Sequence, residues 1–494
     1  MTTDPDHGSS RSHRPLVVVS NREPYQHTMG EDGSISWAPT TGGVGVALDA
    51  LMQERGGVWI AHGSGDADRT VVDSDDKVLV PPDRPAYPLR RLWLTAAEAN
   101  HYYEGFANEG LWPLCHEAHV RPVFRAVDWE HYQLVNERFA SVIEEELLDT
   151  SAPVFIQDYH LAMVAPVLRA RHPGVKSALF WHIPWPHPDR LRICPWRREI
   201  LTGLLANDLL AFQLKRDRRN FVAAARNELG ADVTHDTVRI GNRVTAVQVA
   251  PIGVDYDRIQ QIATEPSVGA DIQRLVSELK IDTEIVGVGV DRLDYTKGIP
   301  ERLEALELLL DRRPDLRGRL TFVQIGVPSR STLDNYVAVE AAIDRKVKEI
   351  NGRYDVARGP IRYRKSALKI KRLVALYRLA DFCVVSSLHD GMNLVAKEFV
   401  AAREDLDGVL VLSELAGAAQ ELHDALIINP YDVGGFTDAL ERAIDMPLDE
   451  RQRRMRALRR VVAGSDVFSW ASDILEGLAS LDPTALPPAP AKPS

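Results

Sequence analysis

The chain is predicted to form two doubly wound α/β domains that face each other across a cleft. Its 494 residues exceed the ordinary size of one domain. Apolar strand-like runs alternate with amphipathic helical stretches, which is typical of parallel sheets covered by helices on both faces. The alternation pauses at 249–253, Val-Ala-Pro-Ile-Gly, and then restarts. We therefore place one domain at 15–250 and the other at 251–464.

The strands are predicted from apolar runs of three to six residues. Before the boundary they are 16–19, 58–61, 154–156, 178–181 and 209–212, and after it 285–290, 320–325, 382–385, 409–412 and 425–428. Helical stretches lie between most of them, such as 301–311 and 333–348. The polar residues 1–14 and the Pro/Ala-rich residues 482–494 are predicted to be disordered tails.

Charge and cysteine usage exclude several classes of protein. A net charge of −11 argues against a nucleic-acid or anionic-membrane partner. The 3 cysteines are scattered without a CxxC pair, which argues against a disulfide framework and a zinc site and fits a reducing cytosol. The first residues contain no apolar signal-peptide core, and no apolar run approaches the length of a membrane span. We expect a cytoplasmic protein.

Polar residues follow the apolar runs of both predicted domains. In doubly wound folds ligands bind at the carboxyl ends of the strands, so these residues are expected to line one cleft. The segments are Ser20-Asn21-Arg22, the pair Gly42-Gly43, 157–160 (Gln-Asp-Tyr-His), 182–186 (His-Ile-Pro-Trp-Pro), 291–298 (Asp-Arg-Leu-Asp-Tyr-Thr-Lys-Gly) and Ser329-Arg330. So many titratable side chains at strand ends outweigh the alternative of scattered loop charges.

The stretch 388–398 has the features of an anion-binding turn. It follows the apolar run 382–385 and leads into a helix, with Asp390 and Gly391 in the turn. Glycine lets the backbone approach a ligand, and a helix N-terminus offers unpaired N–H groups. Arg292 and Lys297 are expected to face this turn and to stabilise a departing nucleoside diphosphate. Glu398, one to two turns into the helix, suits a hydroxyl.

A second anion is predicted in the same cleft. Arg22 and Arg330, from different domains, would suit a group such as a sugar phosphate. Asp158, His182 and Asp390 then remain for sugar hydroxyls. Taken singly, an arginine at a strand end is more often part of a surface ion pair, and a lone histidine such as His182 more often has a structural role.

Several of these segments together resemble a known family. They are 389–398 (His-Asp-Gly-Met-Asn-Leu-Val-Ala-Lys-Glu), 292–298, 182–186 and 20–22, with Tyr102-Tyr103, Trp112-Pro113 and 413–419 (Ser-Glu-Leu-Ala-Gly-Ala-Ala) in the same order. The set resembles the trehalose-6-phosphate synthases, retaining glycosyltransferases of family 20, over about residues 16–479. The resemblance implies the GT-B fold, two Rossmann-like domains facing across a cleft, with the acceptor bound by the first and the nucleotide sugar by the second.

The resemblance also implies the reaction and its residues. Glucose would pass from a nucleoside diphosphate glucose to O1 of glucose 6-phosphate with retention, by a front-face route without a metal or cofactor. UDP-glucose is the first choice of donor, and the sequence leaves GDP-glucose and ADP-glucose open. Arg22, Tyr103, Trp112 and Arg330 would hold the acceptor phosphate, and Asp158 and His182 would contact the reacting sugars. Arg292 and Lys297 would bind the diphosphate, Asp390 the donor glucose, the amides of Asn393, Leu394 and Val395 the phosphates, and Glu398 the ribose. Gly42 and Gly43 would form a flexible donor-side loop.

Further implications concern assembly. The family resemblance implies a homo-oligomer (dimer or tetramer), a functional link to a trehalose-phosphate phosphatase, and a last helix, about 465–480, that packs back onto the first domain. It implies no nucleic-acid or membrane partner.

The sequence departs from the family pattern at three places. Gln157 stands where a histidine is usual, and His389 where an arginine is common. Residues 22–25 (Arg-Glu-Pro-Tyr) and 195–197 (Pro-Trp-Arg) resemble glucosylglycerol-phosphate synthases of the same family, whose acceptor is glycerol 3-phosphate. That acceptor is the alternative prediction.

Two other classes of function have less support in the sequence. A nicotinamide-dependent enzyme would need GxGxxG spacing after a strand, which residues 42–45 lack. A non-catalytic sugar-phosphate sensor would be expected to lose Arg292, Lys297 or Asp390, and all three are present.

Overall fold

The computed structural model describes residues 15–39, 43–147, 152–330, 332–354 and 359–481. The two predicted tails and Gly42 lie outside these ranges. We refer to residues 15–250 as the N-terminal half and to residues 251–464 as the C-terminal half.

The N-terminal half is built on a ten-stranded sheet. Its strands lie in the order β10 (Asp232–Val233), β11 (Thr237–Ile240), β12 (Arg243–Val249), β9 (Leu209–Phe212), β8 (Ser177–Trp181), β7 (Val154–Gln157), β1 (Leu16–Arg22), β4 (Gly57–His62), β6 (Tyr87–Leu92) and β5 (Lys77–Val80). The central strands are parallel, as predicted. The edges are not, because β5 and β11 run antiparallel to their neighbours through short turns.

The C-terminal half is built on a parallel six-stranded sheet. Its strands lie in the order β15 (Ile361–Arg364), β14 (Leu320–Val327), β13 (Ile285–Arg292), β16 (Phe382–Val385), β17 (Val409–Ser413) and β18 (Leu426–Ile428). All ten apolar runs read from the sequence form strands of these two sheets. Several strands extend further than predicted, so that Arg22, Gln157 and Arg292 are last residues of strands rather than loop residues.

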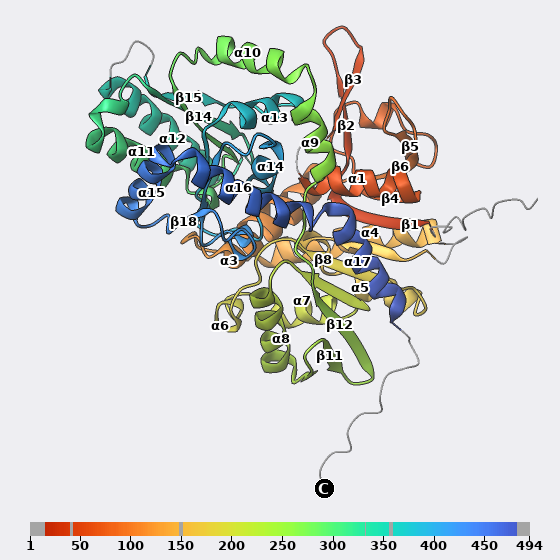
Figure 1. The fold of residues 1–494 in the computed structure, drawn as a ribbon. Coiled ribbons are helices and arrows are strands. Elements are labelled where there is room, and N and C mark those ends of the chain that lie inside the picture. The colour runs from red at the N-terminus through yellow and green to blue at the C-terminus, as the bar shows by residue number, and fades with distance from the viewer. Residues whose placement is uncertain (1–14, 40–42, 148–151, 331, 355–358, 482–494) are drawn as a thin grey trace, which may run out of the picture.

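Helices cover both sheets (Figure 1). In the N-terminal half they are α1 (Gly43–Arg55), α2 (Ala96–Glu98), α3 (Trp112–His116), α4 (Ala126–Leu147), α5 (Val164–Arg171), α6 (Pro188–Leu191), α7 (Arg197–Leu204) and α8 (Lys215–Leu229). The later helices are α9 (Tyr256–Thr264), α10 (Val268–Leu279), α11 (Ile299–Arg312), α12 (Asp334–Arg353), α13 (Ile370–Leu379), α14 (Leu394–Ala402), α15 (Val433–Asp445), α16 (Leu448–Ala463) and α17 (Val467–Ser480).

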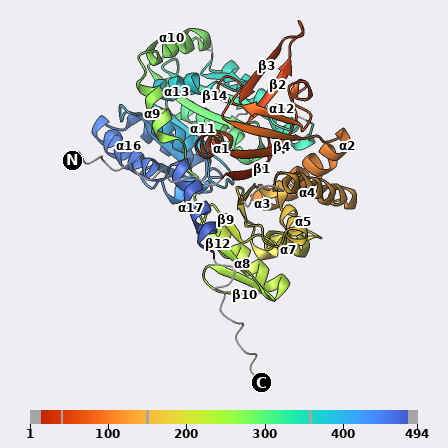
Figure 2. The same ribbon diagram turned by 90° about the vertical axis from the view of Figure 1, so that its right-hand side faces the viewer.

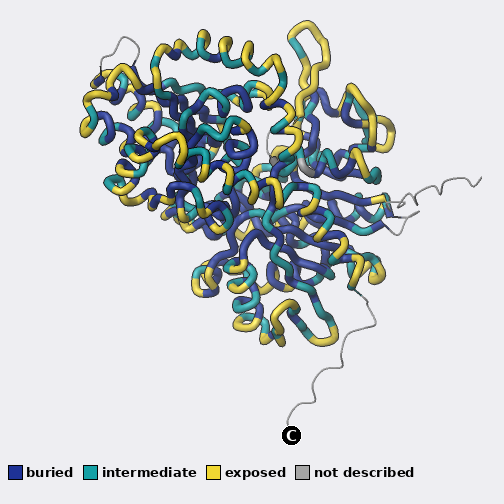
Figure 3. Tube along the Cα trace, viewed as in Figure 1, coloured by how far each residue is buried: buried dark blue, intermediate teal, exposed yellow. Residues whose placement is uncertain are grey.

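The first sheet is buried on both faces because its central strands are apolar at nearly every position. Successive side chains of a strand point to opposite faces. Val17 and Val19 of β1 accordingly join one hydrophobic cluster, and Leu16 and Val18 join another. Figure 3 shows the resulting buried interior, with exposed chain mostly on the outer helices and turns.

The last helix, α17, crosses back to the N-terminal half. It contacts α1, β8 and β9, and its ribbon lies against that sheet in Figure 1. Trp470 is 3% exposed and its ring lies 4.9 Å from that of Phe180 and 5.8 Å from that of Phe155. The chain passes between the halves around Gly253 and again around Ser465, and these two segments touch. A Cβ on Gly253 would lie 2.0 Å from the Ser465 carbonyl oxygen.

A two-stranded hairpin, β2 (Tyr25–Met29) and β3 (Ile35–Pro39), extends from the body of the molecule (Figures 1 and 2). It was not predicted from the sequence, because β3 is exposed throughout and has no continuous apolar run. The hairpin separates Arg22 from the start of α1. Among the described residues, no helix combines the length and apolarity needed to cross a membrane.

Candidate functional site

A cavity of about 480 Å³ lies between the two halves. It is formed where the carboxyl ends of both sets of parallel strands face each other, as expected for doubly wound sheets. The predicted site residues that line it are Arg22, Tyr103, Trp112, Asp158, His182, Arg292, Lys297, Arg330, Asp390, Asn393, Leu394, Val395 and Glu398. Gly43 begins α1, whose next residues Val44 and Gly45 line the cavity, and Gly42 lies outside the described residues.

The anion-binding turn is formed by the segment between β16 and α14. The helix begins at Leu394, because Asn393 caps it by accepting a hydrogen bond from the Ala396 amide. The first turn of α14 therefore presents unpaired N–H groups beside the cavity. Leu394 and Val395 are both cavity residues, so the amides at this end lie where the prediction put them.

Lys297 and Asp390 form a nearly buried ion pair at the same end of the cavity. Lys297 Nζ lies 2.6 Å from Asp390 Oδ2, and their side chains are 11% and 13% exposed. Ser387 and Asn393 also donate to that oxygen. Burial raises the pKa of Asp390, but Lys297 outweighs it and holds the pKa well below its usual range. Asp390 is thus a permanent acceptor with Lys297 beside it.

Gly391 allows the C-terminal half to approach the N-terminal half closely. A Cβ at this position would lie 2.3 Å from the carbonyl oxygen of His182. A side chain would therefore force the turn and the chain after β8 apart. From the sequence, Gly391 was expected to let the backbone approach a ligand. In the structure it also lets one half approach the other.

Arg22 and Tyr103 belong to a second group of cavity residues, which we call the second end of the cavity. Arg22 Nη2 donates to the Tyr103 hydroxyl at 2.9 Å. Tyr103 lies on a π-helical segment, Ala99–Leu111, a conformation frequent at functional sites. Burial raises the pKa of Tyr103, but Arg330 and Arg22 outweigh it and lower the pKa to about 8. This positive field suits an anionic ligand.

Arg330 extends from the C-terminal half to this same end. Its guanidinium lies 4.1 Å from the centre of the Trp112 ring and donates to the Tyr159 hydroxyl at 3.3 Å. Nη1 of Arg330 also lies 3.4 Å from Oδ2 of buried Asp294. Arg292 also lies over Trp112, at 5.2 Å. The structure therefore brings Arg330 together with Tyr103 and Trp112, as predicted.

Asp158 and His182 line the same cavity. Asp158 Oδ1 accepts from the His182 amide at 3.1 Å, and His182 Nε2 lies 2.9 Å from Gln157 Oε1. Burial raises the pKa of Asp158 to about 7 and lowers the pKa of His182 to about 3. His182 is therefore neutral. Gln157 lines the cavity and also contacts the imidazole of His182.

Strained backbone marks three of the cavity residues. Asp158, Arg330 and Asn393 have φ values of +74°, +49° and +78°. Such conformations cost a non-glycine residue about 1–3 kcal/mol and cluster at functional sites. Each of the three carries a side chain that the sequence assigned to the cleft or to its anion-binding turn.

Several buried polar atoms at the cavity have no hydrogen-bond partner among the residues that the structure describes. They are Trp112 Nε1, Gln157 Nε2, His160 Nε2, His182 Nδ1 and Arg330 Nε. Buried polar groups are nearly always paired in folded proteins. Their concentration around one cavity is what a polar ligand with many hydroxyl or phosphate oxygens would satisfy.

The cavity also contains residues to which the sequence assigned no role. Tyr159 and His160 belong to the strand-end segment 157–160 that was expected to line the cleft, and the His160 ring stacks on Tyr103 at 5.5 Å. Gln213 and Leu368 also line the cavity, but nothing in their sequence surroundings distinguishes them.

Glu398 lies in the cavity wall but already has a partner. Its carboxyl group accepts from the Tyr377 hydroxyl at 2.9 Å, and burial raises its pKa. A hydroxyl of a ligand would therefore share this carboxyl group with Tyr377.

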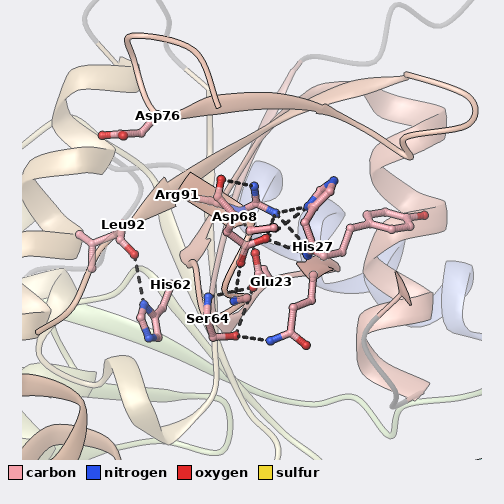
Figure 4. Close-up of polar contacts among 12 residues, drawn as sticks. Glu23, His27, His62, Ser64, Asp68, Asp76, Arg91 and Leu92 are labelled. Carbon is pink, nitrogen blue, oxygen red and sulfur yellow. Dashed lines mark hydrogen bonds and ion pairs between the residues drawn. The ribbon is translucent and has the colours of Figure 1, made fainter. Parts of the chain in front are cut away.

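A buried ion cluster fixes the chain directly after Arg22 (Figure 4). Arg91 Nε donates to Glu23 at 2.8 Å, and Arg91 Nη2 lies 2.8 Å from Asp68. The three side chains are at most 1% exposed. One guanidinium thus faces two carboxyl groups, and desolvation together with the hydrogen bond to Asp68 raises the pKa of Glu23 to about 7. The cluster also receives His27 of β2, whose amide donates to Asp68 at 2.8 Å.

Glu23→Gln is expected to change how stability depends on pH. The folded pKa of Glu23 is raised from 4.5 to about 7, so the folded state binds more protons and the free energy of unfolding falls as pH rises through this interval. The substituted amide does not titrate but retains a donor toward Asp68 and an acceptor toward Arg91. Thermal unfolding between pH 5 and pH 8 should therefore show the variant gaining stability relative to the wild type as pH rises.

Glu31→Gln at the exposed hairpin tip is the matched control. It should follow the wild type at every pH. Parallel curves for the wild type and Glu23→Gln would contradict the assignment of a near-neutral titration to Glu23.

No group of three or more His, Cys, Asp or Glu side chains within the described ranges is arranged to hold a metal ion.

Comparison with known proteins agrees with this geometry. The model of glycosyltransferase family 20 matches residues 14–480. A trehalose-6-phosphate synthase of Mycolicibacterium smegmatis is 38% identical, over 98% of this chain and 96% of the relative. An α,α-trehalose-phosphate synthase (UDP-forming) from Burkholderia xenovorans, solved with glucose 6-phosphate, has a TM-score of 0.84 at 33% identity, covering 94% of this chain and 100% of the other.

A further solved structure, from E. coli and bound with UDP-2-fluoro glucose, has a TM-score of 0.84 at 32% identity and covers 95% of this chain and 99% of the other. The fold and the cleft between its two halves define a glycosyltransferase of the GT-B type, which confirms the predicted fold. The chain belongs to glycosyltransferase family 20, and the prediction made from its motifs is confirmed.

Proposed function

We propose that this enzyme transfers glucose from UDP-glucose to O1 of glucose 6-phosphate with retention, giving α,α-trehalose 6-phosphate and UDP. The observation that carries the proposal is one cavity with two anion-binding ends, Arg22, Tyr103 and Arg330 at one and Lys297 with the N-terminus of α14 at the other. Relatives of the chain have been solved with glucose 6-phosphate and with a UDP-glucose analogue.

The proposal assigns the donor diphosphate to Lys297, to the amides of residues 393–395 and to Arg292, whose guanidinium also lies 5.2 Å from the Trp112 ring of the acceptor-phosphate group. Asp390 would accept hydroxyls of the donor glucose, since its carboxylate stays ionised beside Lys297. Glu398, a cavity residue one turn into α14, would bind the ribose. Gly42 and Gly43 would close the donor side. As the glycosyl–phosphate bond breaks, the cation and the helix dipole would stabilise the charge that develops on the leaving group.

At the acceptor end, the proposal assigns the phosphate to Arg22, Tyr103, Trp112 and Arg330. The two guanidiniums lower the pKa of Tyr103 against the effect of burial, so they already act on one anionisable oxygen. The unpaired Trp112 Nε1 supplies a further donor. Asp158 and the neutral His182 line the same cavity and would contact the reacting sugars.

We propose a front-face reaction without a covalent intermediate. A double displacement needs a free carboxylate nucleophile beside a second carboxyl group. Asp390 is held by three donors, and the pKa of Asp158 is raised to about 7, so neither is poised as that nucleophile. The leaving phosphate would then take the proton of the acceptor hydroxyl, while the protein supplies position and charge. The reaction would need no metal or cofactor.

The test is a donor-by-acceptor activity matrix with identification of the product. Donors are UDP-, GDP- and ADP-glucose, and acceptors are glucose 6-phosphate, glycerol 3-phosphate and glucose. The expected product is α,α-trehalose 6-phosphate from UDP-glucose and glucose 6-phosphate, with the α linkage checked by NMR, and unchanged activity after chelation. Preference for glycerol 3-phosphate would replace the proposal with the glucosylglycerol-phosphate alternative that residues 22–25 and 195–197 indicate.

We further propose that the enzyme works in the cytoplasm as a homo-oligomer and that a trehalose-phosphate phosphatase consumes its product. The cysteines Cys115, Cys194 and Cys383 are all buried free thiols, which supports a reducing compartment. Light scattering after size-exclusion chromatography tests the oligomer, and a monomer at working concentration would contradict it.

A further inference from the structure

His389, the residue before Asp390, connects the donor end of the cavity to the N-terminal half. Its Nδ1 lies 2.6 Å from the carbonyl oxygen of His116, the last residue of α3. Its Nε2 lies 3.0 Å from Nη2 of Arg216 on α8. One imidazole of the C-terminal half is therefore held by two different helices of the other half.

The partners fix the protonation state of the ring. A carbonyl oxygen only accepts, so Nδ1 of His389 carries the proton and donates it to His116. A guanidinium only donates, so Nε2 accepts from Arg216 and carries no proton. The ring is thus neutral in its Nδ1–H tautomer. Burial first, and the charge of Arg216 second, lower the pKa of His389, which agrees with this state.

The surrounding charges are consistent with a neutral ring. Arg216 lies 3.7 Å from the carboxylate of its buried neighbour Asp217, and Glu117 and Asp390 are the acidic groups acting on His389. The ring of His116 lies 6.3 Å from that of His389, and burial lowers its pKa to about 3, so it adds no charge. A second proton on His389 would place an N–H directly against Arg216.

Both ends of this connection reach cavity residues. On one side, Asp390 follows His389 and pairs with Lys297 at 2.6 Å. On the other, the His116 ring lies 3.9 Å from that of Trp112, which in turn packs against Arg330. The connection therefore joins Asp390, which is predicted to bind the donor glucose, to the predicted binding site for the phosphate of glucose 6-phosphate.

We propose that His389 is a positioning residue: together with Arg216 and the carbonyl of His116 it holds the Asp390 turn against the N-terminal half and so sets the closed form of the cleft. This goes beyond the proposed function, on which only the kinetic part of the test rests. An arginine at position 389 would offer no acceptor to Arg216 and would place two guanidiniums side by side. Arg216 in this position therefore requires a residue such as histidine at position 389.

The test separates the two hydrogen bonds by amide substitution. In His389→Asn the amide nitrogen takes the place of Nδ1, so it retains the bond to His116 and loses the one to Arg216. In His389→Gln the amide oxygen takes the place of Nε2, so it retains the bond to Arg216. Each is combined with Arg216→Met, and Arg219→Met, an exposed residue of the same helix, is the control.

The expected result is a double-mutant pattern in kcat/KM for the donor. Arg216→Met should lower kcat/KM about tenfold in the wild type and in His389→Gln, as for loss of a hydrogen bond to a charged group. It should change kcat/KM less than about twofold in His389→Asn, where the bond is already absent. Arg219→Met should resemble the wild type. Equal effects of Arg216→Met in all three backgrounds would overturn the proposal.

A second measurement does not depend on the reaction. Small-angle X-ray scattering of the full chain without ligand should give a larger radius of gyration for Arg216→Met than for the wild type or Arg219→Met. An unchanged radius would overturn the proposal even if no transfer activity were found. A larger radius without activity in the wild-type protein would instead contradict the proposed function and leave the connection supported.

Discussion

Lys297→Ala is expected to lower kcat about 10²- to 10³-fold, the usual cost of removing one donor that stabilises a developing oxyanion. The reason is that Lys297 is held by Asp390 at the donor end, next to the N-terminus of α14, where the leaving diphosphate would gain charge. KM for glucose 6-phosphate should change little, because the predicted phosphate site is formed by other side chains, those of Arg22, Tyr103, Trp112 and Arg330. Steady-state kinetics with both substrates varied measures the two effects separately.

Lys365→Ala is the matched control, since Lys365 forms a partly exposed ion pair with Glu340 and Asp344 away from the cavity. Thermal unfolding of Lys297→Ala should be recorded as well, because Asp390 loses its buried partner. Turnover equal to that of the wild type would refute the role of Lys297.

Arg330→Ala is expected to raise KM for glucose 6-phosphate about 10- to 100-fold, as for loss of a hydrogen bond between charged groups. The side chain is only 4% exposed and is held by Trp112, Tyr159 and Asp294, so its positive charge stays at the predicted phosphate site beside that of Arg22. Activity with free glucose as acceptor should barely change, because that acceptor has no phosphate to lose.

The comparison of the two acceptors is the internal control for Arg330→Ala, and Arg345→Ala, an exposed residue of α12, is the external one. An equal loss with glucose and with glucose 6-phosphate would show a general effect on the cleft. That outcome would remove Arg330 from the phosphate site.

The parts of the fold that the sequence predicted are those that bury continuous apolar runs. β1, β7 and β16 could be read directly because every side chain in their centres is buried. The hairpin formed by β2 and β3 carried no such signal, since most of its side chains are at least partly exposed. The antiparallel strand β11, next to the edge strand β10, was missed for the same reason, because only one of its residues is buried.

The site was predicted as a set of strand-end residues, but not its internal contacts. That Asp390 and Lys297 are cleft residues follows from their places after β16 and β13. That they pair with each other depends on how two loops meet in space, and sequence spacing does not contain that information. The same holds for Arg330 on Trp112, and for His389, whose partners lie 173 and 273 positions away along the chain.

The position of α17 has a consequence for how the protein is made. The N-terminal half is complete in sequence by residue 250, yet the face of its sheet that carries Phe155 and Phe180 is covered by Trp470 of α17. During synthesis the part of that face that α17 covers stays open until residues 467–480 have left the ribosome. A nascent chain, or one truncated before α17, would thus expose apolar side chains of the first sheet, which favours aggregation or chaperone binding until α17 has been made.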